Sequence, residues 1–143
     1  CSSTQILNYQ KRLSGPLLDR IDLTINVSRI AHEDLLSHNS SSDSQQKQFE
    51  NIIKEARKLQ ANRYKNSNKY NADIDSSSVD KITALTAEAK HFLLTAAKKL
   101  DLSARGYFKV IKVARTIADL ESSREITISH IAESLQYRQI IPT

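Results

Sequence analysis

The chain has 143 residues, of which 39% are hydrophobic and 26% charged, the composition of an ordinary globular domain. Its net charge of +5 is compatible with an acidic partner such as nucleic acid, and equally with a merely basic surface. No apolar run approaches the roughly 20 residues of a membrane span, and no signal peptide opens the chain. The single cysteine, Cys1, excludes an intrachain disulfide, so we expect a cytoplasmic protein without membrane contacts.

Glycine is scarce, with only Gly15 and Gly106 in the whole chain. A phosphate-binding loop needs several clustered glycines, because backbone amides must approach the phosphates without hindrance from Cβ atoms. The chain therefore lacks a Walker A loop, and we expect it alone neither to bind ATP tightly nor to hydrolyse it. The four histidines and the pair Asp73 and Asp75 have no metal-ligand spacing, so no metal site is predicted.

The first predicted elements are a turn at 14–16 and a strand at 21–27, whose apolar residues occupy the odd-numbered positions. A lone strand cannot be stable, so we expect its sheet partners outside this chain. The chain also starts at Cys1 and contains no methionine. We interpret it as a piece of a longer protein. A short helical turn is predicted at 32–36.

A long helix is predicted next, after a Ser- and Gln-rich segment at 37–48 that is typical of a flexible linker. The helix is expected from residue 45 to 65, and its apolar positions follow helical spacing: Phe49, Ile52, Ile53, Ala56 and Leu59 or Gln60. Polar residues at 66–78 predict a second loop, with a short turn after Ser78.

Three amphipathic helices are predicted to close the chain, with Thr86, Ser103 and Thr127 as their N-caps. Their apolar stripes are Ala89, Phe92, Leu93, Ala96, Ala97 and Leu100; Tyr107, Val110, Ile111, Ala114, Ile117 and Ala118; and Ile128, Ile131, Ala132 and Leu135. Four amphipathic helices joined by loops indicate a mainly α protein built as a helical bundle.

Several motifs resemble those of Mg-chelatase-like AAA+ ATPases of the ComM/YifB family. They are S-G-P-L-L-D-R-I-D-L at 14–23, L-S-A-R-G-Y at 102–107, V-A-R-T-I-A-D-L at 113–120 and I-A-E-S-L-Q-Y-R at 131–138. The pair Asn71-Ala72 also falls where this family often has N-A. The resemblance covers residues 12–138, and the segments 37–48 and 66–78 diverge from it.

The resemblance implies the C-terminal part of an AAA+ motor. Residues 1–30 would be the end of the α/β core, including its last strand, and residues 31–143 would be the helical lid. The Walker A and B motifs and a cysteine-rich insertion would precede Cys1. The full-length protein would use ATP and Mg²⁺, assemble identical subunits into a hexameric ring and act on DNA, since ComM-like members are associated with DNA uptake by transformation and with branch migration.

Arg20 corresponds to the arginine finger of the resembling family, which reaches ATP bound by the neighbouring subunit. A guanidinium supplies two parallel charged donors to the oxygens over which charge spreads during phosphoryl transfer. The alternative is an ion pair of Arg20 with Asp19 or Asp22.

Arg105 corresponds to the sensor 2 arginine, which contacts nucleotide phosphates from the lid. It falls in the first turn of a predicted helix, where a cation opposes the helix dipole, and the adjacent Gly106 is a poor helix former. Two unfavourable local features side by side indicate a function. The family usually has alanine where this chain has Gly106. The alternative is a surface arginine paired with Asp101.

The helix predicted at 45–65 carries a basic face that could contact DNA phosphates or simply be solvated. Its candidate DNA-binding residues are Lys54, Arg57, Lys58 and Arg63. Tyr64 and Tyr70 lie near these charges and could stack on bases.

Other charged residues have structural interpretations. Arg115 and Asp119 are four residues apart on one helix and can pair, and Arg138 ends the last helix, where a cation suits the dipole. Lys11 and Arg12 could contact a neighbouring subunit or be solvated.

Two alternatives to a DNA motor remain open at this point. One is a chelatase-type motor that remodels a protein partner, and the other is a standalone helical binding module. The unpaired strand argues against the standalone module.

Overall fold

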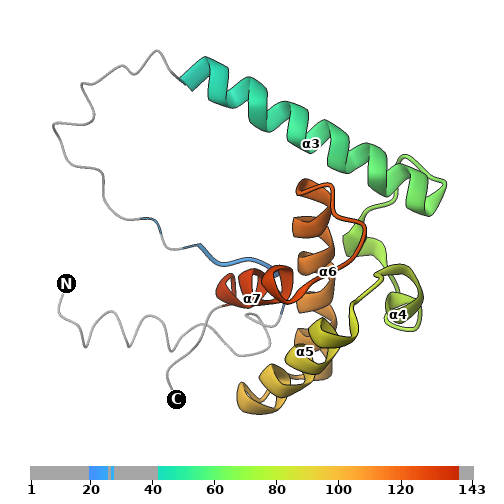
Figure 1. Cartoon of the computed structure of the whole chain (residues 1–143), viewed down its shortest axis with the longest axis vertical. Helices are drawn as coiled ribbons and strands as arrows, with labels where there is room; N and C mark the ends of the chain where they lie inside the picture. Colours follow the sequence, from blue (N-terminus) through green and yellow to red (C-terminus); the bar gives the residue numbers. More distant parts are fainter. Residues whose placement is uncertain (1–19, 26, 28–41, 139–143) are drawn as a thin grey trace, which may run out of the picture.

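The computed structural model describes residues 20–25, 27 and 42–138, and this part of the chain is mainly α-helical, as expected (Figure 1). The elements in chain order are α3 (Ser42–Tyr64), the 3-10 helix η2 (Asn71–Asp73), α4 (Val79–Ile82), α5 (Ala87–Lys99), α6 (Ala104–Leu120) and α7 (Ile128–Gln136). None of these helices is both long enough and apolar enough to cross a membrane.

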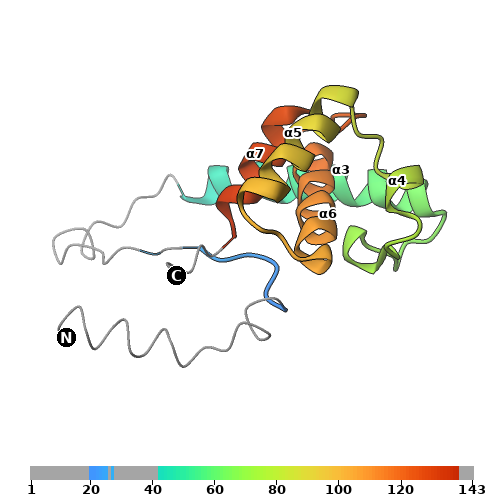
Figure 2. The same cartoon turned by 90° about the horizontal axis from the view of Figure 1, so that it is seen from below.

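Helix α6 is the centre of the bundle, with α3 and α7 packed against it, and α5 packs against α7 (Figures 1 and 2). Its apolar stripe is buried as predicted, and Val110, Ile111 and Ala114 are at most 2% exposed. Leu93 of α5 and Ile131 of α7 complete the core with them. The apolar area removed from water around α6 is the main source of stability for the fold.

The helix starts predicted from the sequence are confirmed. The Thr86 hydroxyl accepts a hydrogen bond from Ala89 N–H, and the Ser103 hydroxyl accepts one from Gly106 N–H. Thr127 is the N-cap of α7, where its own N–H donates to Nδ1 of His130 at 3.0 Å. These bonds satisfy amides that have no intrahelical partner.

One predicted boundary was wrong. Helix α3 begins at Ser42, so residues 42–48 of the expected linker are helical. The Gln and Lys residues there are good helix formers, and no glycine or proline interrupts them. The loop predicted at 66–78 also contains the short helix η2, and the short turn expected after Ser78 is confirmed as α4. Leu100 and Ile128, predicted to be internal, are 43% exposed because each stands at the margin of its stripe.

The strand predicted at 21–27 is not formed in the described residues 20–25 and 27. Ile21, Leu23, Ile25 and Val27 are 47–87% exposed, so the apolar odd-numbered face is not covered. A strand needs a hydrogen-bonded neighbour, and the described part of the chain offers no second strand. The turns predicted at 14–16 and 32–36, and the residues Lys11 and Arg12, lie outside the described residues.

Candidate functional site

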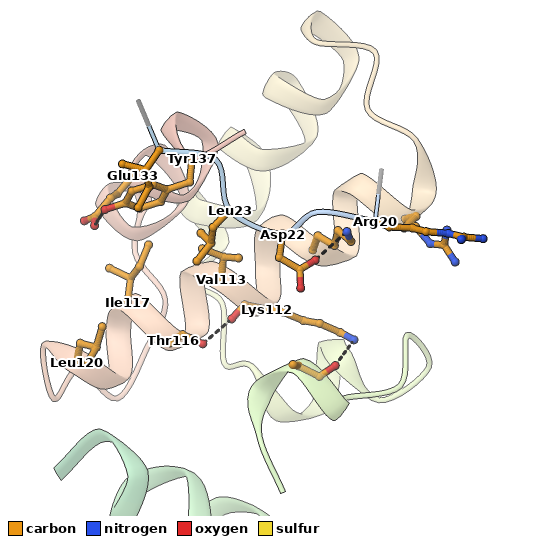
Figure 3. Close-up of a pocket in the computed structure, with 14 residues that line it drawn as sticks. Arg20, Asp22, Leu23, Lys112, Val113, Thr116, Ile117, Leu120, Glu133 and Tyr137 are labelled. Atoms are coloured by element: carbon orange, nitrogen blue, oxygen red, sulfur yellow. Dashed lines mark hydrogen bonds and ion pairs between the residues drawn. The ribbon is translucent and has the colours of Figure 1, made fainter. Parts of the chain in front are cut away.

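A groove of about 660 Å³ lies along α6, covered in part by the segment at 20–25 (Figure 3). Its apolar lining includes Val113 and Ile117 of α6 and Leu23 of the covering segment. Four cations line it together with two acids: Arg20, Arg105, Lys109, Lys112, Asp22 and Glu133. The two arginines singled out by the sequence therefore lie along the same groove, although 85 positions separate them in the chain.

The lysines of the groove have partners. Lys109 Nζ lies 2.7 Å from a carboxylate oxygen of Asp22, and Lys112 Nζ donates to the carbonyl oxygen of Ala72 at 2.8 Å. Figure 3 shows both contacts as dashed lines. The positive charge of these two side chains is therefore already engaged within the chain.

Arg105 has no such partner among the described residues. It is exposed in the first turn of α6, directly after the helix start at Ala104. Asp101, the alternative partner considered from the sequence, makes no ion pair with it. The positive end of the helix dipole and the guanidinium together create a potential that favours an anion.

Arg20 is also exposed and makes no ion pair with a described residue. Asp22, one of its two alternative partners, pairs with Lys109 instead, and Asp19 lies outside the described residues. Figure 3 shows the Arg20 side chain at one end of the groove, pointing away from Leu23 and Val113. Its five donors are thus available to a group outside the groove floor.

Gly106 lies beside the guanidinium of Arg138 in this structure. A Cβ atom placed on it would come within 2.3 Å of Nη1 of Arg138, so the guanidinium lies against the first turn of α6. From the sequence, we expected the Arg138 charge to stabilise the C-terminal end of its own helix. In the structure, its guanidinium lies beside the first turn of α6. Because the crowding atom is the far end of a flexible side chain, a shift of the Arg138 guanidinium would make room for a Cβ atom here.

The basic face of α3 is less continuous than the sequence suggested. Lys54 and Lys58 are 67% and 69% exposed, but Glu50 lies 3.9 Å from the first and Glu55 lies 2.7 Å from the second. These acids offset part of the positive potential that DNA phosphates would meet.

The two arginines of this face are held within the fold. Arg57 donates to the carbonyl oxygen of Ser67 at 2.9 Å and lies over the ring of Tyr70, 3.7 Å from its centroid. Arg63 turns inward to Asp119 and is only 20% exposed. Tyr64 donates its hydroxyl hydrogen to Asn71 at 2.6 Å, so this ring is also engaged internally.

A buried ionic network joins α3, η2 and α6. The Asp119 carboxylate is fully buried and accepts hydrogen bonds from Arg63 (2.8 Å to Oδ2), Arg115 (3.1 Å to Oδ1) and the side-chain amide of Asn71 (2.9 Å). The Asn71 amide also donates to Thr116, and its carbonyl oxygen accepts from Arg63. The buried carboxylate is thus paired with two guanidiniums and is not left without a counter-charge.

Arg115 uses its remaining donors on the backbone. It donates to the carbonyl oxygens of Ser123 at 2.6 Å and Arg124 at 2.9 Å, which tie the loop between α6 and α7 to the helix. Burial lowers the pKa of Arg115, whereas the hydrogen bond from Arg63 to Asp119 raises the pKa of Arg63.

The structural interpretation of Arg115 and Asp119 as a pair on one helix is confirmed. Sequence reasoning missed that Arg63 and Asn71 belong to the same network. The pair Asn71-Ala72, noticed only as part of the resemblance, was the available signal for Asn71. Asp73, considered with Asp75 for a metal, accepts a hydrogen bond from Tyr70 N–H, and no three metal-ligating side chains cluster in the described ranges.

Comparisons with known proteins give the following matches. The family model described as "Magnesium chelatase, subunit ChlI C-terminal" matches residues 42–138, and the model "Magnesium chelatase, subunit ChlI" matches residues 1–35. Competence protein ComM of Haemophilus influenzae is 36% identical over 98% of the chain, and the uncharacterized protein YifB of Escherichia coli is 35% identical over 98%. The chain spans 27% of the length of each of these relatives.

Proposed function

Because this chain belongs to the Mg-chelatase-like family, with the ChlI C-terminal domain over residues 42–138, we propose that it is the lid end of an ATP-driven ring motor. In this proposal the full-length protein is a cytoplasmic hexamer of identical subunits that hydrolyses ATP between subunits. Arg20 acts as the arginine finger and Arg105 as sensor 2. The remodelled substrate is DNA, as the resemblance to ComM-like proteins implies; one relative is named Competence protein ComM.

One observation carries the proposal: the two arginines of one groove that lack partners are the two that the sequence motifs single out. Lys109 and Lys112, in the same groove, are paired. An exposed guanidinium at a helix start, without a counter-ion among the described residues, is a binding group for phosphate. The residues present therefore fit the outer phosphates of a nucleotide.

The catalytic contribution of this chain follows from its own side chains. ATP would supply the phosphoryl group together with its negative charge, and Mg²⁺ would neutralise part of that charge. Arg20 would stabilise the charge that develops on the transferring phosphoryl oxygens. Arg105 would orient the same phosphates, and because it belongs to α6, binding of the phosphates would act directly on that helix. Since both arginines line one groove, we propose that they serve the same nucleotide.

The ATPase assay of the full-length protein tests this function. Arg20→Ala should lower the turnover number by about 10³-fold or more, as loss of an arginine finger does in GTPases. Arg105→Ala should lower it by about 10²-fold. Arg124→Ala removes an exposed arginine outside the groove and should leave turnover unchanged. Wild-type turnover in both groove variants would refute the assignment.

A protein substrate is the second candidate, and one observation favours it. Glu50 and Glu55 stand beside the exposed lysines of α3, which weakens the case for a DNA-binding face there. Stimulation of the full-length ATPase by DNA, lost on raising salt, supports the DNA motor. No stimulation by DNA of any form would favour a protein substrate.

A further inference from the structure

The segment at 20–25 is attached to the helical bundle at two points. Asp22 pairs with Lys109 of α6, and Thr24 N–H donates to the carbonyl oxygen of Tyr137, at the end of α7, at 2.8 Å. These contacts cross the groove from one helix to another. They fix the backbone two and four residues beyond Arg20.

The Asp22–Lys109 ion pair is well placed to position both arginines. Asp22 is two residues from Arg20, and Lys109 is four residues from Arg105, one helical turn along α6. A single contact therefore links the backbone that carries one arginine to the helix that carries the other.

The burial of Lys109 indicates that the contact is specific. The Lys109 side chain is 22% exposed and its Nζ atom is buried, while the Asp22 side chain is 55% exposed. Asp22 is the only charge partner that the described residues provide for this ammonium group. Covering an ammonium group without a counter-charge is unfavourable, so the segment that buries Lys109 also supplies the carboxylate that compensates it.

We infer that Asp22 and Lys109 are positioning residues that hold Arg20 and Arg105 in one register toward a shared phosphate group. This inference depends on the proposed function of the two arginines. Neither Asp22 nor Lys109 needs to touch the nucleotide, since their charges are used on each other. Small errors in the position of a catalytic group are costly, and a displacement of 1 Å can reduce a rate by about 10²-fold.

Charge reversal in the full-length protein tests the inference. Asp22→Lys and Lys109→Glu should each lower kcat for ATP hydrolysis by about 10-fold or more, with a smaller change in KM. The double variant restores an ion pair of opposite polarity and should recover kcat to within about 3-fold of wild type. Lys109→Arg keeps the charge and should retain activity.

Three results separate this inference from its premise. If Arg20→Ala retains full turnover, the proposed function fails and the inference fails with it. If Arg20→Ala loses activity but both single reversals keep wild-type kcat, the positioning inference alone is overturned. A double reversal no better than the single variants also overturns it. Thermal unfolding of each variant gives its folded fraction, and comparing kcat per folded molecule excludes a purely structural effect.

Discussion

Helix α6 carries an arginine near each end, and the two have opposite environments. Arg105, in the first turn, is exposed and unpartnered within the described residues. Arg115, in the second half, is 1% exposed and donates to Asp119 and to backbone carbonyls. Full use of donors marks a group that holds the fold together, whereas unused donors mark a group available to a ligand. The use of the guanidinium donors thus distinguishes Arg115, which stabilises the fold, from Arg105, which is a candidate for ligand binding.

The network around Asp119 also includes an unfavourable electrostatic interaction that the groove lacks. Asp119 stands near the C-terminal end of α6, where the helix dipole disfavours an anion. Arg63 and Arg115 together offset that cost, and they do so away from water. Removal of the carboxylate should therefore be far more damaging to folding than removal of Arg105.

The largest expected effect on stability is that of Asp119→Ala. The change leaves two guanidiniums without their shared counter-ion, and loss of one partner of a buried pair costs about 3–5 kcal/mol. Urea or thermal unfolding of this chain measures it. Asp119→Asn keeps the shape of the side chain without its charge, so its free energy of unfolding should lie between those of Asp119→Ala and wild type. A loss below about 1 kcal/mol for Asp119→Ala would contradict the network.

Asn71→Ala should have the next largest effect. Asn71 is 2% exposed and exchanges hydrogen bonds with Arg63, Thr116 and Asp119, so its loss leaves buried polar groups unsatisfied. The expected loss of stability is about 1–3 kcal/mol, read from equilibrium unfolding. Asn68→Ala, an exposed asparagine of the same loop, is the matched control and should change stability by less than about 0.5 kcal/mol.

A smaller effect is expected at the helix cap. Ser103→Ala removes the acceptor for Gly106 N–H, which should cost about 1 kcal/mol, whereas Ser103→Gly should cost only a few tenths. The two variants can be compared in one unfolding series. Equal stability of Ser103→Ala and wild type would show that the cap contributes nothing.

The contrast between the ends of α6 also explains what the sequence could and could not reveal. The caps Thr86 and Ser103 and the buried stripe of α6 were predictable, because each depends on residues within a few positions of one another. The strand predicted at 21–27 is not formed in the described residues 20–25 and 27, because a strand needs hydrogen-bonded partners and we expected those outside this chain.

The inward turn of Arg63 was beyond local reasoning. The residue it binds, Asp119, is 56 positions away, and nothing near Arg63 distinguishes it from Lys58 on the same helix. Arg20 and Arg105 line the same groove, and this arrangement likewise results from tertiary packing. Motif resemblance named both arginines individually but carried no information about their shared location.

The smallest expected effect on stability is that of Arg105→Ala. An exposed cation at a helix start is mildly unfavourable, so its removal should leave the unfolding midpoint unchanged or slightly raised, within about 1 kcal/mol. A clear loss of stability would mean that Arg105 holds the fold together, as Arg115 does.

The most direct test of the difference between the two ends of α6 is ATP turnover per folded molecule, measured in the full-length protein for Arg105→Ala and Asn71→Ala. Turnover should fall by about 10²-fold for Arg105→Ala. For Asn71→Ala it should stay within about 3-fold of wild type once the folded fraction is taken into account. Wild-type turnover with Arg105→Ala would contradict the central claim that the unpartnered arginines of the groove serve a phosphate.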